Sequence, residues 1–161
     1  MNSLQHPMRK LSLTLVAVVT SGLLMTACGG GVEVGVEIPP PPNADFDIGA
    51  KLNGQRLHGV DVFPDDEQTI QVQVGDVLEL DSSGPVYWET VAGNSAGIPT
   101  QAGTTVLYGG AAFTEAVSTR DQLVFTISSA QPLVAPVQMT IYATSLHDAY
   151  QTARIDLVVT N

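Results

Sequence analysis

Hydrophobic and polar residues alternate with a period of two along most of the chain from Ala44 to Asn161. Ile70, Val72 and Val74, for example, are separated by two glutamines. Such alternation is typical of a strand with one buried face. Valine, isoleucine and threonine, which favour strands, are abundant, and no stretch sustains the 3.6-residue period of an amphipathic helix. The pattern therefore predicts an all-β domain over residues 44–161.

Turn residues divide this region into short strands about 8–12 residues apart. Asn53-Gly54 is the strongest hairpin signal, because both residues accept the positive φ of a type I′ turn. Gly59 on the returning arm predicts a bulge, and a loop is expected from Val91 to Thr104. The spacing favours a β-sandwich, with a small closed barrel as the structural alternative. The expected strands are 46–52, 57–62, 70–74, 78–81, 86–91, 105–108, 112–117, 123–127, 137–143 and 155–159.

The first residues have the organisation of a targeting signal. A polar segment containing Arg9 and Lys10 precedes an uncharged run from Leu11 to Leu24. A helix that crosses a bilayer needs roughly 20 apolar residues, so this run is short for a permanent span. A basic segment followed by a short apolar one and small residues is typical of a secretory signal peptide.

The end of the apolar run is more specific. It reads Leu24-Met25-Thr26-Ala27-Cys28 and contains the one cysteine of the chain. This motif resembles the lipobox of bacterial lipoproteins, although Met25 stands where that family prefers leucine. The resemblance implies that the signal peptidase removes residues 1–27 and that Cys28 carries a covalent lipid. An ordinary secretory signal with a chance cysteine, or an uncleaved anchor, is the alternative interpretation.

Residues 28–43 are expected to form a tether between the lipidated Cys28 and the folded domain. The segment after the cysteine reads GGGVEVGVEIPPPPN. Three glycines make a flexible start, and four consecutive prolines favour a stiff polyproline II spacer. By resemblance to lipoproteins of diderm bacteria, Gly29 favours the outer membrane over retention at the inner membrane. The sequence thus predicts a lipid-anchored protein of the cell envelope.

The segment Thr69–Asn161 resembles immunoglobulin-like sandwiches, particularly the bacterial type known from polycystic-kidney-disease repeats. The resemblance rests on Val74–Ser83, on Trp88 in the third strand, and on the closing strands Val137–Thr144 and Thr152–Thr160. It implies that the tryptophan packs between two sheets. The sequence departs from the family after the tryptophan, where it reads WETVAG, and no tyrosine corner is evident. The hairpin over residues 45–62 lies outside the resemblance and is expected to be an N-terminal addition.

Composition and charge narrow the possible functions. The chain has 161 residues, 6 basic and 16 acidic, with a formal net charge of −10 and a pI of about 4.3. Nucleic-acid binding is therefore not expected, because phosphate recognition needs clustered lysine and arginine. A single cysteine excludes an intramolecular disulfide. No established catalytic motif is present, and His58 and His147 are interpreted as surface residues, so no enzyme activity is predicted.

Asp61, Asp65, Asp66 and Glu67 form the densest acidic group. Several oxygen ligands from one loop are typical of calcium sites, but the spacing differs from the D-x-D-x-D-G pattern. A solvated acidic loop is therefore the favoured interpretation, with calcium as the alternative and no other cofactor expected.

The aromatic residues that could build a ligand platform are Tyr87, Trp88, Tyr108, Phe113 and Tyr150. Trp88 is expected in the core, and Tyr87 and Tyr150 at the surface or a strand edge, so a ligand site would be lined by Tyr87, Tyr108 or Tyr150. The favoured function is a non-catalytic lipoprotein that displays an immunoglobulin-like module for contact with another envelope protein. A lipoprotein that binds a glycan or small ligand is the alternative, and an envelope hydrolase ranks last.

Overall fold

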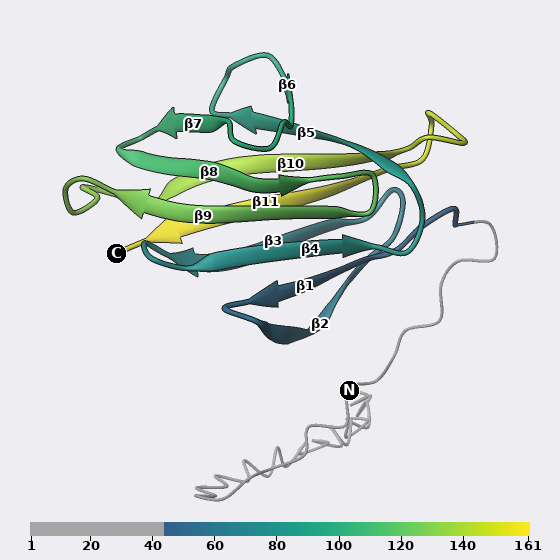
Figure 1. The fold of residues 1–161 in the computed structure, drawn as a ribbon, viewed down its shortest axis with the longest axis horizontal. Helices are drawn as coiled ribbons and strands as arrows, with labels where there is room; N and C mark the ends of the chain where they lie inside the picture. Colours follow the sequence, from purple (N-terminus) through teal and green to yellow (C-terminus); the bar gives the residue numbers. More distant parts are fainter. Residues whose placement is uncertain (1–43) are drawn as a thin grey trace, which may run out of the picture. The chain divides into compact units, whose positions relative to one another are not determined.

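The computed structural model describes residues 44–161, which form eleven strands and no helix (Figure 1). The strands make two separate sheets, as expected for a sandwich and not for a closed barrel. In spatial order, the six-stranded sheet contains β2 (Gln55–Val62), β1 (Ile48–Leu52), β4 (Val77–Ser82), β9 (Gln122–Ser129), β8 (Ala111–Ser118) and β7 (Thr105–Tyr108). The five-stranded sheet contains β3 (Glu67–Gln73), β11 (Thr152–Thr160), β10 (Val137–Ser145), β5 (Val86–Ala92) and β6 (Ile98–Pro99).

The alternating pattern of the sequence becomes the inner and outer faces of these sheets. Leu123, Phe125 and Ile127 of β9 are fully buried. Met139 and Ile141 of β10, in the other sheet, are fully buried in the same core. Both sheets thus bury one apolar face, which is the arrangement that stabilises a sandwich without disulfides. Trp88 on β5 is only 3% exposed, so its expected position in the core is confirmed.

The N-terminal hairpin follows the turn chemistry of its sequence. Asn53 and Gly54 have φ values of 53° and 79°, as a type I′ turn requires. The β1–β2 register shifts beyond Gly49, and Gly59 within the irregular part of β2 has a φ of 77°, so the expected bulge is confirmed.

This hairpin is not an appendage to the sandwich. β1 pairs along its whole length with β4, and Ile48 and Ala50 are buried in the core. Only β2 lies outside as the edge strand. The hairpin over residues 45–62, expected as an N-terminal addition, thus continues the six-stranded sheet through β1. Sequence alternation does not reveal which strands pair across a long separation.

Most pairings are antiparallel, and one is not. β3 runs parallel to β11, with Ile70 opposite Leu157. β3 therefore closes the five-stranded sheet at one edge, while the short strand β6 lies at the other. β6 falls within the segment expected to be a loop, and its two residues carry no alternating pattern that could have indicated it.

Candidate functional site

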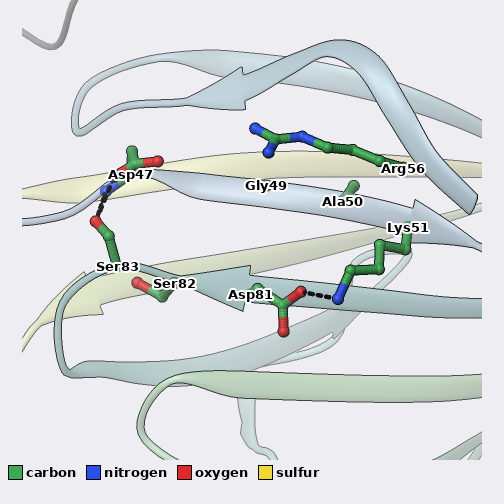
Figure 2. Close-up of a pocket in the computed structure, with 8 residues that line it drawn as sticks. All are labelled: Asp47, Gly49, Ala50, Lys51, Arg56, Asp81, Ser82 and Ser83. Atoms are coloured by element: carbon green, nitrogen blue, oxygen red, sulfur yellow. Dashed lines mark hydrogen bonds and ion pairs between the residues drawn. The ribbon is translucent and has the colours of Figure 1, made fainter. Parts of the chain in front are cut away.

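A shallow hollow of about 240 Å³ lies on the outer face of the six-stranded sheet, where β1, β2 and β4 meet (Figure 2). Gly49 lines it, and a Cβ added at this position would meet no atom within 4 Å. Strand register places Gly49 between Asp61 and Asp81 on the same face. The lining residues, here called the hollow, are Asp47, Gly49, Ala50, Lys51, Arg56, Asp81, Ser82 and Ser83.

Paired charges fill the surface around the hollow. Lys51 Nζ lies 2.7 Å from both Glu79 Oε1 and Asp81 Oδ2. Gln122 Nε2 donates to the same two carboxylates at 3.0 and 3.1 Å. Arg56 is paired with Asp61 at 3.1 Å. Both cations of the hollow are therefore already satisfied by the protein itself.

The pKa values of this network follow from its contacts. Hydrogen bonds to Asp81 and Glu79 raise the pKa of the Lys51 ammonium above its ordinary value. Partial burial alone would raise the pKa of Asp81, but the hydrogen bonds from Lys51 and Gln122 outweigh it and hold that pKa below the ordinary range. The network thus keeps opposite charges together and leaves little for a ligand to bind.

A second depression has a different character. This cleft of about 370 Å³ lies between the start of β5, the turn from β8 to β9, and the start of the β10–β11 loop, so both sheets contribute to it. Backbone hydrogen bonds fix its walls: Val86 N donates to Arg120 O at 2.8 Å and Leu146 N to Pro85 O at 3.0 Å. The lining residues, here called the cleft, are Val86, Tyr87, Trp88, Thr100, Ser118, Thr119, Arg120 and Leu146.

The polar groups of the cleft are incompletely paired. The described residues include four cations, and Arg120 is the one that forms no ion pair with another described residue. Trp88 Nε1 is buried and has no hydrogen-bond partner within residues 44–161. The hydroxyls of Thr100 and Ser118 contact each other at 2.8 Å. Tyr87 and Leu146 add apolar surface, at 43% and 47% exposure.

A buried carboxylate holds the segment behind the cleft. Glu115 on β8 is fully buried, and its Oε2 accepts a hydrogen bond of 2.5 Å from Gln101 N. Its backbone N–H donates a hydrogen bond to Thr104 O, and its backbone C=O accepts one from Gly103 N. Its Oε1 has no partner in the described part of the chain. Burial raises the pKa of Glu115, and the bond from Gln101 only partly opposes the rise.

Glu115 was not singled out by sequence reasoning, although a signal exists. It follows Ala111 and Phe113 at the two-residue spacing of the apolar face of β8. A carboxylate in that series is either exposed at a strand end or buried and hydrogen-bonded. The structure shows the second case.

The acidic group expected as a candidate calcium site is dispersed. Asp61 pairs with Arg56, and Glu67 pairs with Arg154 at 3.1 Å on the other sheet. Asp65 and Asp66 lie on the turn between β2 and β3. Across residues 44–161, no three acidic, histidine or cysteine side chains are gathered where they could hold a metal ion.

The two histidines are exposed and lie on different elements, His58 on β2 and His147 on the β10–β11 loop. The hydrogen bond between His147 and Ser145 comes from the backbone N–H of the histidine, at 3.0 Å. Ser145 Oγ itself donates to Asp45 at 2.8 Å. This serine–aspartate contact caps a loop and involves no imidazole.

Of the three tyrosines singled out from the sequence, Tyr87 lines the cleft. Tyr108 packs over Gly93, where an added side chain would lie 2.3 Å from the tyrosine hydroxyl. Tyr150 is 92% exposed.

The proposed lipidation residue, Cys28, lies outside the described residues, as do the signal peptide over residues 1–27 and the tether over residues 28–43. Within residues 44–161 there is no helix with the length and hydrophobicity needed to span a bilayer. In comparisons with known proteins, no family model, curated protein or solved structure matches this chain.

Proposed function

We propose that this protein is a non-catalytic lipoprotein of the bacterial cell envelope, anchored through a lipid on Cys28, whose immunoglobulin-like sandwich binds an extended segment of another envelope protein. The observation that carries the proposal is the open edge strand β7. The anchor rests on the lipobox-like sequence that ends at Cys28.

The strand order supports the immunoglobulin-like assignment. In that fold one sheet has the order A-B-E-D and the other G-F-C. The strands β1, β4, β9 and β8 occupy the first four positions, and β11, β10 and β5 occupy the other three. Trp88 lies on β5, the position of the buried core tryptophan of that fold. β2, β3, β6 and β7 extend the two sheets.

β7 is suited to accept an additional strand. It pairs with β8 on one side only, and Leu107 on its outer face is 77% exposed. Thr105, Thr114 and Thr126 lie opposite one another in a row across β7, β8 and β9. The outer-face positions in this part of the sheet carry no charged residue, in a chain with a net charge of −10. An exposed edge with free backbone groups and an apolar side chain is the usual receptor for strand addition.

The β7 turn and the first described residues lie at opposite ends of β10. Asp45 donates its N–H to Gln151, and its carboxylate accepts from Ser145 at the end of β10. The turn after β7 packs against Val137 at the start of β10. The nine residues of β10 separate these points by roughly 26 Å. The β7 turn therefore lies at the far end of the sandwich from Asp45 (Figure 1).

The experiment has two parts. Cys28→Ser should release the protein from the membrane fraction and abolish palmitate labelling. A photoreactive phenylalanine analogue at Leu107 should give one discrete crosslinked product in intact cells, and the same analogue at Tyr150, an exposed aromatic residue outside β7, should not. Retention of the Cys28→Ser protein in membranes would overturn the anchor, and equal products from both positions would overturn the edge-strand site.

A further inference from the structure

The cleft combines a free cation with a buried donor. Arg120 has no ion pair among the described residues, whereas Lys51, Arg56 and Arg154 each have at least one. Trp88 lines the same cleft, and its Nε1 is the one buried side-chain nitrogen in the described region that lacks a hydrogen-bond partner. A buried donor without an acceptor destabilises the protein that contains it. Of these two groups only Arg120 is open to a ligand, because Trp88 Nε1 has essentially no exposed surface. An oxygen that accepts hydrogen bonds would satisfy the guanidinium of Arg120.

A carboxylate matches these donors best. The planar guanidinium of arginine presents paired N–H groups that match the two oxygens of a carboxylate. Carboxylate oxygens also accept bonds from neutral donors such as a hydroxyl group. The Thr100 and Ser118 hydroxyls, which contact each other at 2.8 Å, add donors and acceptors for further polar atoms.

The rest of the cleft favours a ring attached to that carboxylate. Tyr87 and Leu146 line the cleft and are 43% and 47% exposed, whereas Val86 is buried and offers little surface to a ligand. Aromatic side chains pack against flat apolar surfaces, including the faces of sugar and aromatic rings. The volume of about 370 Å³ lies at the small end of ligand sites, which suits one or two rings.

We infer that the cleft binds a small carboxylate that carries a ring, with Arg120 holding the carboxylate and Tyr87 packing against the ring. Two sources share this chemistry, a uronic acid within a glycan and a free aromatic acid. The inference goes beyond the proposed function and uses none of the residues of β7.

Glu115 would support this site as a positioning residue. It holds the backbone of Gln101, and the adjacent Thr100 forms one wall of the cleft and donates its N–H to Trp88 O at 3.2 Å. The walls are thus fixed by bonds from both sheets before a ligand arrives, which lowers the entropic cost of binding.

The single tryptophan of the chain makes the test specific. Trp88 is the only source of indole fluorescence, so a ligand-induced change in that signal arises at a residue that lines the cleft. The protein, solubilised in detergent, is titrated with D-glucuronate, with phenylacetate and with uncharged D-glucose. We expect a saturable fluorescence change with a carboxylate, and binding of glucose at least roughly tenfold weaker, because glucose lacks the charge that Arg120 recognises.

Matched arginine variants decide the outcome. Arg120→Gln should weaken carboxylate binding roughly tenfold or more, whereas Arg56→Gln, which removes a paired arginine of the hollow, should leave it unchanged. Tighter binding of glucuronate than of phenylacetate would identify a glycan acid, and the reverse order a free aromatic acid. The absence of a saturable change with either carboxylate, or a response that survives Arg120→Gln, would overturn the inference. The Leu107 crosslink should persist in Arg120→Gln, so the two proposals fail independently.

Discussion

The hollow and the cleft are depressions of similar size, about 240 and 370 Å³, but their polar groups differ. Both cations of the hollow, Lys51 and Arg56, contact carboxylates within about 3 Å. In the cleft, Arg120 forms no ion pair with a described residue, and Trp88 Nε1 has no acceptor there. The two depressions therefore differ in the pairing of their polar groups more than in their concavity, and this contrast is the basis for inferring a ligand in the cleft and none in the hollow.

Strand register explains why the cations of the hollow are paired and why Arg120 of the cleft has no ion pair with a described residue. Within the six-stranded sheet, pairing of β1 with β4 places Lys51 directly opposite Glu79, so the sheet itself brings opposite charges together. Arg120 lies on the turn between β8 and β9, where no ladder sets its neighbours. The adjacent Asp121 accepts a hydrogen bond from Thr119 instead. The turn thus leaves its cation available while the sheet does not.

Replacing Trp88 by alanine should have the largest effect on stability. The side chain is 3% exposed and shared between the core and the cleft. Loss of a buried aromatic side chain costs about 3–5 kcal/mol, which urea unfolding followed by circular dichroism would measure. Trp88→Phe is the control and should cost roughly 1–2 kcal/mol, because it keeps a ring and removes an N–H that has no partner. Equal losses in the two variants would show that the indole N–H is paired in the folded protein.

Glu115→Gln should stabilise the folded protein, by less than Trp88→Ala destabilises it. Because burial raises the pKa of Glu115 in the folded state, the folded protein binds more protons than the unfolded chain between the ordinary carboxyl pKa and the raised one. Stability therefore falls as pH rises through that window, and the penalty persists above it. The amide keeps an acceptor for Gln101 without the buried charge, so the variant should be more stable at pH 7 by about 1 kcal/mol.

The pH dependence provides the control for this variant. The advantage of Glu115→Gln should vanish below about pH 4, where the carboxyl group is protonated in both the folded and the unfolded states. Glu79→Gln, in the paired network of the hollow, should instead destabilise the protein at pH 7. Denaturant titrations at a series of pH values would measure both. A Glu115→Gln protein less stable than the parent at pH 7 would contradict the assignment of an unpaired carboxylate.

The sequence predicted the strands better than it predicted the site. Alternation located β3, β5, β9, β10 and β11, and Asn53-Gly54 located the first hairpin, because both signals depend on neighbouring residues. The incorporation of β1 into the sheet depends on its pairing with β4, about 30 residues away in sequence, which no local pattern encodes.

The cleft was still less accessible to sequence reasoning. Its walls come from four segments, around Val86, Thr100, Arg120 and Leu146, which only the packing of two sheets brings together. Tyr87 was recognised as a candidate for an aromatic site, but its companions Arg120 and Leu146 carry no pattern that marks them. By contrast, the acidic residues from Asp61 to Glu67, close in sequence, separate onto two sheets because the chain crosses between them.

The smallest expected effect is on the melting temperature, when a paired cation, Lys51, and one without an ion pair to a described residue, Arg120, are each removed. Lys51→Met leaves Glu79 and Asp81 facing each other without a cation, so the melting temperature at neutral pH should fall by a few degrees. Because the folded-state pKa of Asp81 is lowered, this contribution is present above the ordinary carboxyl pKa and is lost as pH falls through the folded value. The melting temperatures of the parent and the variant should therefore converge in acid.

Arg120→Gln, which removes a cation without an ion pair to a described residue, should leave the melting temperature unchanged at every pH. A fall equal to that of Lys51→Met would show that Arg120 stabilises the fold, and the contrast between the hollow and the cleft would then disappear.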